Sequence, residues 1–124
     1  MIVPYTFNIR YWGIQMNGAE VLVKQQPILI NDLYIDPVGY QVKLGQREIE
    51  LTVKEFELLS LFARNKGKVV RRSELLPFIS TLGIVDEDRA INVMICRLRK
   101  KIESDPHHPK RLVSVRGLGY RLKE

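Results

Sequence analysis

The hydrophobic positions are most regular between residues 86 and 102. In this segment aliphatic residues recur at intervals of four, three and four positions, at Ile91, Ile95, Leu98 and Ile102. This spacing is that of one buried stripe on an α-helix. The segment opens with three acidic residues, which complement the positive end of a helix dipole. The pattern therefore predicts an amphipathic helix over residues 87–102.

The side of this predicted helix that faces away from the stripe is rich in cations. At about 100° per residue, it carries Arg89, Val93, Cys96, Arg97 and Lys100, with Asn92 and Arg99 on its flanks. Such a face is suited to contact an anionic partner.

A hairpin pattern follows the basic helix. Residues 112–115 alternate as a strand, Gly117 and Gly119 indicate a turn, and the chain returns through residues 120–122. Arg116 and Arg121 lie near this expected turn, whose two glycines we interpret as serving the turn alone. A basic helix followed at once by a basic hairpin is typical of a winged helix-turn-helix.

The segment before the basic helix reads as a small sheet and two helices. Four short antiparallel strands are predicted at residues 28–30, 33–35, 40–44 and 48–51, because residues with turn chemistry separate them. One face of these strands is expected to be buried, through Leu33, Ile35, Val42, Leu44, Ile49 and Leu51. The role of this sheet is expected to be scaffolding.

Thr52 and Glu55 have the spacing of a capping box, so a helix is predicted to begin there and to end near Gly67. Its inner stripe is expected to be Phe56, Leu59, Phe62 and Ala63. Residues 69–70 then lead into a second helix at about residues 72–80, which Pro77 should shorten or bend.

The charge distribution points to a nucleic acid. The formal net charge is +6, and residues 89–123 hold ten Lys or Arg against two acids, a net of +8. The rest of the chain therefore sums to −2, and the positive charge lies in the predicted helix and hairpin, where Lys110 and Arg111 add to it. This polarity is typical of a nucleic-acid binder.

Other chemistry finds little support in the sequence. A single cysteine excludes an intramolecular disulfide, no Cys/His group has metal-ligand spacing, and we expect no cofactor. Catalysis by Cys96 would need His107 or His108 as partner, so we interpret it as a small surface residue. No paired carboxylates or phosphate-cradling glycine loop indicate an enzyme. The 124 residues, with no apolar run of membrane length and no secretion signal, predict one cytoplasmic domain.

Three stretches resemble the C-terminal DNA-binding domain of OmpR/PhoB-type response regulators of two-component systems. They are Asp-Arg at 88–89, Arg-Leu-Arg-Lys-Lys at 97–101 and Val-Arg-Gly-Leu-Gly-Tyr-Arg at 115–121, and the similarity extends back to about residue 28. The resemblance implies an α+β winged helix-turn-helix over residues 27–124, with an N-terminal antiparallel four-stranded sheet, three helices and a C-terminal β-hairpin wing. The acidic receiver domain that usually precedes it does not fit here, so we expect a stand-alone regulator, a fragment or a diverged orphan.

The resemblance implies a sequence-specific regulator of transcription that binds double-stranded DNA. Helix 87–102 would enter the major groove and wing 112–122 the minor groove. Arg97 would lead the base contacts, with Asn92, Val93 and Cys96 at other reading positions. The expected backbone or minor-groove contacts are Arg89, Arg99, Lys100, Ser114, Arg116 and Tyr120. Packing of the Tyr120 ring beneath the wing is an equal alternative.

The chain departs from the family at several positions. Arg71 stands where a capping Ser or Thr is usual, Ser80 where a bulky Trp is common, and Cys96 where a cation is frequent. Loop 81–86 keeps the approximate length of the family's transactivation loop, so contact with RNA polymerase remains an expectation. Packing of Leu82 and Ile84 on the core is the alternative. A homodimer on repeated half-sites is also expected.

Two other functions remain open. One is a sequence-neutral nucleic-acid binder, and the other is a protein-interaction module that uses Val93, Met94 and Cys96. Residues 1–26 form an N-terminal extension in which Asn17-Gly18 predicts a hairpin turn. This extension could be an extra hairpin, a dimerisation arm or the remnant of a linker.

Overall fold

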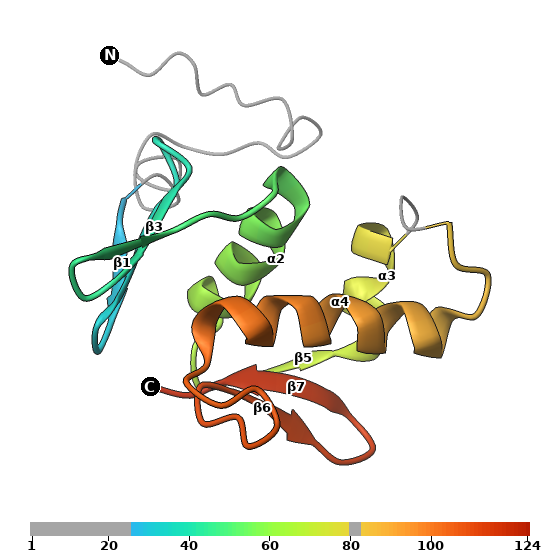
Figure 1. Ribbon diagram of the computed structural model, residues 1–124. Helices are drawn as coiled ribbons and strands as arrows, with labels where there is room; N and C mark the ends of the chain where they lie inside the picture. Colours follow the sequence, from blue (N-terminus) through green and yellow to red (C-terminus); the bar gives the residue numbers. More distant parts are fainter. Residues whose placement is uncertain (1–25, 80–82) are drawn as a thin grey trace, which may run out of the picture.

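The computed structural model describes residues 26–79 and 83–124. The predictions for Asn17-Gly18 and the rest of segment 1–25, for Ser80 and for Leu82 lie outside the described residues. The described part contains two antiparallel sheets and three helices (Figure 1). Helix α4 runs between a layer formed by α2 and α3 and the sheet of β5, β6 and β7 (Figure 1). One hydrophobic core connects all these elements.

The N-terminal sheet has the order β1-β2-β3-β4, with strands at Ile28–Ile30, Leu33–Asp36, Gln41–Leu44 and Arg47–Ile49. Ile35 is paired with Ile28 and with Val42, and Val42 with Ile49, so this row faces the core. The predicted sheet is confirmed, but its last strand ends at Ile49 instead of residue 51. Consequently Leu51 follows the strand and is only partly buried, as is Leu44.

Helix α2 (Val53–Arg64) begins with the expected capping box. The Glu55 N–H donates to Thr52 Oγ1 at 3.1 Å, and the Thr52 N–H donates to Glu55 Oε1 at 3.0 Å. These two bonds satisfy backbone donors that a helix start leaves free. The predicted inner stripe is confirmed, and Leu58 is buried with it.

The region between α2 and α4 differs from the prediction. The sequence predicts a connection at residues 69–70, but Val69–Arg71 forms strand β5, which pairs with β7. Helix α3 spans Arg72–Ile79 and contains Pro77. Arg71 offers no capping oxygen, but Glu74 Oε2 accepts its N–H at 2.8 Å. This is one of the two hydrogen bonds of a capping box.

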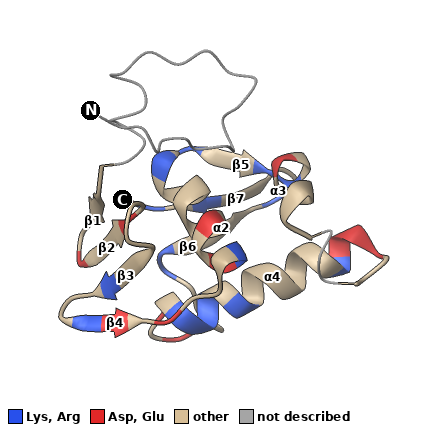
Figure 2. Cartoon of the chain, turned by 90° about the horizontal axis from the view of Figure 1, so that it is seen from above, with Lys and Arg blue, Asp and Glu red and all other residues tan. Residues whose placement is uncertain are grey.

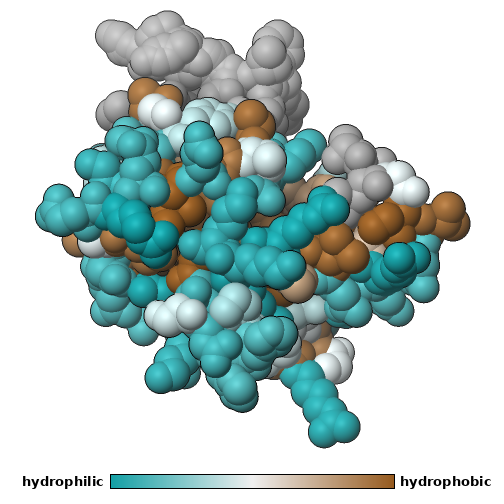
Figure 3. Space-filling model, viewed as in Figure 1, coloured by the Kyte–Doolittle hydropathy of each residue, from teal (hydrophilic) through white to brown (hydrophobic). Residues whose placement is uncertain are grey.

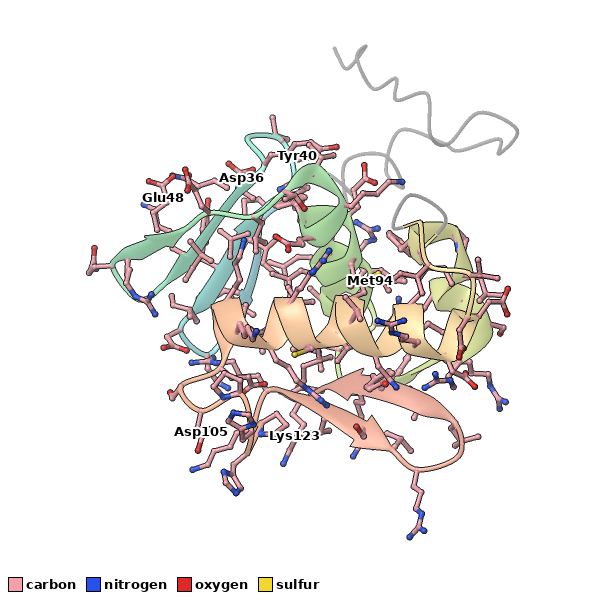
Figure 4. All side chains as sticks on the ribbon, turned by 45° about the vertical axis from the view of Figure 1, so that its right-hand side comes forward. Asp36, Tyr40, Glu48, Met94, Asp105 and Lys123 are labelled. Carbon is pink, nitrogen blue, oxygen red and sulfur yellow. The ribbon has the colours of Figure 1, made fainter. Side chains whose placement is uncertain are left out.

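Helix α4 (Glu87–Ile102) has the predicted orientation. Its four aliphatic residues at positions 91, 95, 98 and 102 are at most 1% exposed. Asp86 caps the helix by accepting the Arg89 N–H at 3.3 Å. Met94 is 6% exposed and lies on the α2 side of α4 (Figure 4), so its expected place on an interaction surface is wrong.

The hairpin is formed by β6 (Leu112–Val115) and β7 (Gly119–Leu122) within a sheet of order β5-β7-β6. Gly117, with φ +81°, makes the predicted turn. Gly119 does not serve the turn, because it lies in β7 opposite Arg71 of β5. Arg121 also lies in β7, opposite Val113, and is not at the turn.

Within the described residues no helix combines the length and apolarity needed to cross a membrane.

Candidate nucleic-acid interface

The exposed face of α4 carries the residues expected to read DNA. Arg89, Asn92, Cys96, Arg97 and Lys100 are exposed, and Val93 is half-buried. Because the opposite stripe is fixed in the core, these side chains cannot turn away from solvent as a group. Figure 2 shows Lys and Arg gathered at the C-terminal half of α4 and acids at its N-terminal end.

The hairpin of β6 and β7 lies beside α4 in both ribbon views (Figures 1 and 2). Arg116 is exposed immediately before the turn residue Gly117, and Leu118 beyond it is 42% exposed. Ser114 is exposed on β6. The wing therefore lies next to α4, the helix that carries the basic face.

Arg99 joins the helix to the wing. Its Nε donates to the Leu112 carbonyl at 2.9 Å, and its Nη2 donates to Ser114 Oγ at 3.2 Å. The guanidinium carbon also lies 5.6 Å from the centre of the Tyr120 ring, which is cation–π range. Three contacts therefore hold this half-buried cation against β6 and β7.

Tyr120 packs beneath the wing, with only 6% of the residue exposed. Its hydroxyl donates to Asn92 Oδ1 at 3.2 Å and accepts from Arg72 Nη1 at 3.4 Å. This geometry matches the alternative of a packed ring. The hydroxyl nevertheless touches a candidate reading residue.

The sequence carries no local signal for the role of Arg72. It starts α3, pairs with Asp88 of α4 at 2.9 Å and reaches Tyr120 of β7. Burial lowers the pKa of Arg72, but its hydrogen bonds to Tyr120 and Asp88 outweigh burial and raise that pKa. No local motif could have revealed this role, because Tyr120 is 48 positions further along the chain.

Two cations of the basic segment point to other parts of the protein. Lys101 Nζ binds the Glu50 carbonyl and Glu55 Oε1, both at 3.0 Å. Arg111 forms a bidentate pair with Asp32 at 2.8 and 3.3 Å, and the hydrogen bond from Arg111 lowers the pKa of Asp32. The expectation that Arg111 adds positive field is therefore corrected, since Asp32 offsets its charge.

The described part of the chain shows no cluster of three or more His, Cys, Asp or Glu that could hold a metal ion. Cys96 is exposed and in the free thiol form. His108 Nδ1 lies 2.9 Å from Asp105 Oδ2 and lowers the pKa of that carboxyl.

Comparisons with known proteins agree with this geometry. A family model described as "Transcriptional regulatory protein, C terminal" matches residues 46–122. The DNA-binding domain of Klebsiella pneumoniae RstA, solved in complex with the RstA box, is 33% identical with a TM-score of 0.68. That match covers 79% of this chain and 97% of the RstA chain.

Two further solved structures are similar. The C-terminal effector domain of BfmR from Acinetobacter baumannii is 36% identical, with a TM-score of 0.66, over 80% of this chain and 91% of that chain. The response regulator DrrB, a Thermotoga maritima OmpR/PhoB homologue, is 30% identical, with a TM-score of 0.69. The DrrB match covers 89% of this chain and 54% of DrrB, so this chain spans about half of DrrB.

Proposed function

Because this chain belongs to the OmpR/PhoB-type DNA-binding domains of response regulators, which bind specific DNA sequences to regulate transcription, we propose which of its elements enters each groove of the DNA. Helix α4 enters the major groove of duplex DNA. The β6–β7 wing enters the adjacent minor groove.

The observation that carries this proposal is the division of α4 into two faces. Its aliphatic stripe is at most 1% exposed, which holds Arg97, Asn92 and Lys100 outward beside the wing. The B-DNA major groove admits one α-helix, and its base edges present patterns that Arg and Asn can read. The minor groove attracts cations where it is narrow, which suits Arg116.

The proposed contacts follow from exposure. Arg97 reads a base, and Asn92, Val93 and Cys96 occupy neighbouring reading positions. Phosphate contacts come from Arg89, Lys100 and Ser114. Arg99 adds positive charge to the interface and also anchors the wing. Tyr120 affects DNA binding through its contacts with Asn92, Arg72 and Arg99.

Substitutions of two exposed residues on the same helix test these roles. Arg97→Ala should weaken binding to a selected site by about 1 to 3 kcal/mol and relax specificity at one position. Lys100→Ala should weaken all sequences alike and reduce the salt slope by about 1. Gel shifts at several salt concentrations, on selected and random duplex, measure both effects. Equal losses of Arg97→Ala on the two duplexes would contradict base reading.

Partner contacts beyond DNA are part of the proposal. Val85, in loop 81–86, is 98% exposed, and Figure 3 shows hydrophobic surface on the side where this loop lies. Such an apolar site suits contact with RNA polymerase. Val85→Asp should then reduce activated transcription in vitro without changing DNA affinity.

Binding of two protein molecules as a pair should appear as a second shifted band on duplexes with two half-sites.

A further inference from the structure

A chain of polar contacts starts at Asp88 of α4, passes through α3 and the wing, and returns to the exposed face of α4. Asp88 Oδ1 lies 2.9 Å from Arg72 Nη2, and Arg72 Nη1 lies 3.4 Å from the Tyr120 hydroxyl. The same hydroxyl lies 3.2 Å from Asn92 Oδ1. Tyr120 is buried, whereas Asn92 is exposed. The contacts therefore end at a side chain that faces the proposed DNA.

The structure gives each of these hydrogen bonds a direction. A guanidinium can only donate, so the Tyr120 oxygen is the acceptor in its bond with Arg72. The Tyr120 hydroxyl donates its single hydrogen to Asn92 Oδ1, the amide atom that faces it. The amide oxygen of Asn92 consequently faces the protein, and its Nδ2 group keeps two N–H donors for a partner.

This orientation limits what Asn92 can recognise. In the usual pairing with adenine, asparagine donates to N7 and accepts from the N6 amino group. An amide whose oxygen is held by Tyr120 presents its donor side instead. The acceptors it fits are phosphate oxygens, the N7 atom of either purine, guanine O6 and thymine O4.

We propose that Tyr120 is a positioning residue that, together with Arg72, holds Asn92 so that this side chain donates to an acceptor on DNA. This inference rests on the proposed placement of α4 in the major groove. Tyr120 sets the polarity of the contact without reaching the DNA itself. The Tyr120 hydroxyl makes the hydrogen bonds with Arg72 and Asn92, so it has a role separate from the packing of the ring.

A double-mutant cycle tests this inference. The probe is a duplex selected by the wild-type protein from a random library, compared with random duplex at one salt concentration. Tyr120→Phe, Asn92→Ala and the double variant are measured, and thermal unfolding checks that each is folded. Tyr120→Phe should weaken binding to the selected duplex by about three- to tenfold. In the Asn92→Ala background the same change should have no further effect.

Asn92→Asp gives an independent test that leaves the buried residues untouched. Aspartate can still accept from Tyr120, but it replaces the two donors by a negative charge. It should therefore bind both selected and random duplex more weakly than Asn92→Ala does.

Three results would overturn the inference. These are wild-type affinity for Tyr120→Phe, an equal loss from that change in the Asn92→Ala background, and wild-type affinity for Asn92→Asp. Failure of the proposed function would look different, because the wild-type protein itself would then show no preference for any duplex.

Discussion

Gly119 lies so close to Val70 that a Cβ atom built on the glycine would be 2.1 Å from the Val70 carbonyl oxygen. The contact occurs where β7 pairs with β5, so only a residue without a side chain permits this pairing. The wing is therefore paired closely with β5, the strand that leads directly into α3.

Gly119→Ala should be strongly destabilising, by about 3 kcal/mol or more, because strand β5 or β7 must shift to relieve the clash. Gly117→Ala is the matched control. Gly117 has φ +81° but no atom within 4 Å of a built Cβ, so strain alone should cost about 1 kcal/mol. Urea unfolding of both variants measures the difference, and equal costs would contradict the role assigned to Gly119.

Glu103 organises the loop between α4 and the wing. Its two carboxylate oxygens accept the backbone N–H groups of Lys110, Arg111 and Leu112 at 2.7 to 3.1 Å. Glu103→Gln replaces one acceptor oxygen by a donor and should lower the free energy of unfolding by about 1 to 3 kcal/mol. The exposed Glu50→Gln serves as control and should change stability by less than about 0.5 kcal/mol. Equal stability of the Glu103→Gln and Glu50→Gln proteins would show that the Glu103 carboxylate does not stabilise this loop.

Ser60 is buried in α2, and its hydroxyl has no hydrogen-bond partner in the described part of the chain. An unpaired buried hydroxyl is costly, and alanine favours a helix more than serine does. We therefore expect Ser60→Ala to raise the free energy of unfolding by about 1 kcal/mol. Thermal unfolding beside the exposed Ser73→Ala measures this gain, and a loss of stability would show that the hydroxyl is satisfied in solution.

The ion pair between Glu55 and Lys101 predicts how stability depends on pH. Burial raises the pKa of Glu55, but hydrogen bonds from Thr52 and Lys101 outweigh it and hold that pKa below its ordinary range. Because the unfolded chain binds this proton more tightly, the stabilisation is complete above the unfolded pKa. It is lost as the pH falls through the lower, folded-state pKa.

Glu55→Gln should consequently cost about 1 kcal/mol near pH 7 and much less near pH 3. Denaturant unfolding of the wild type and the variant across this range measures the change. A difference in stability that stayed constant with pH would show that the Glu55 carboxylate does not contribute through its charge.

The sequence predicted those features that depend on neighbouring residues. The α4 stripe was recognisable because residues three and four positions apart share one helix face, and Thr52 with Glu55 formed a local capping signal. The four-stranded sheet was predicted from turn chemistry, although its last strand ended earlier than expected because Ile49 makes the last pairing with β3.

Features set by distant pairing could not be predicted in this way. Strand β5 has only three residues and is defined by its partner β7, more than 40 positions later. The same pairing gives Gly119 its tight contact and brings Arg72 to Tyr120. Likewise, the sequence does not distinguish Arg99 from the neighbouring cations, because its partners Leu112 and Ser114 lie on the distant strand β6.

We propose that the exposed face of α4 reads base sequence. The most direct test is the ratio of two dissociation constants of the wild-type protein, for a selected duplex and for random duplex of equal length at equal salt. If α4 reads bases, the wild-type protein should bind the selected duplex more tightly by about a thousandfold or more. Equal dissociation constants for the two duplexes would contradict it.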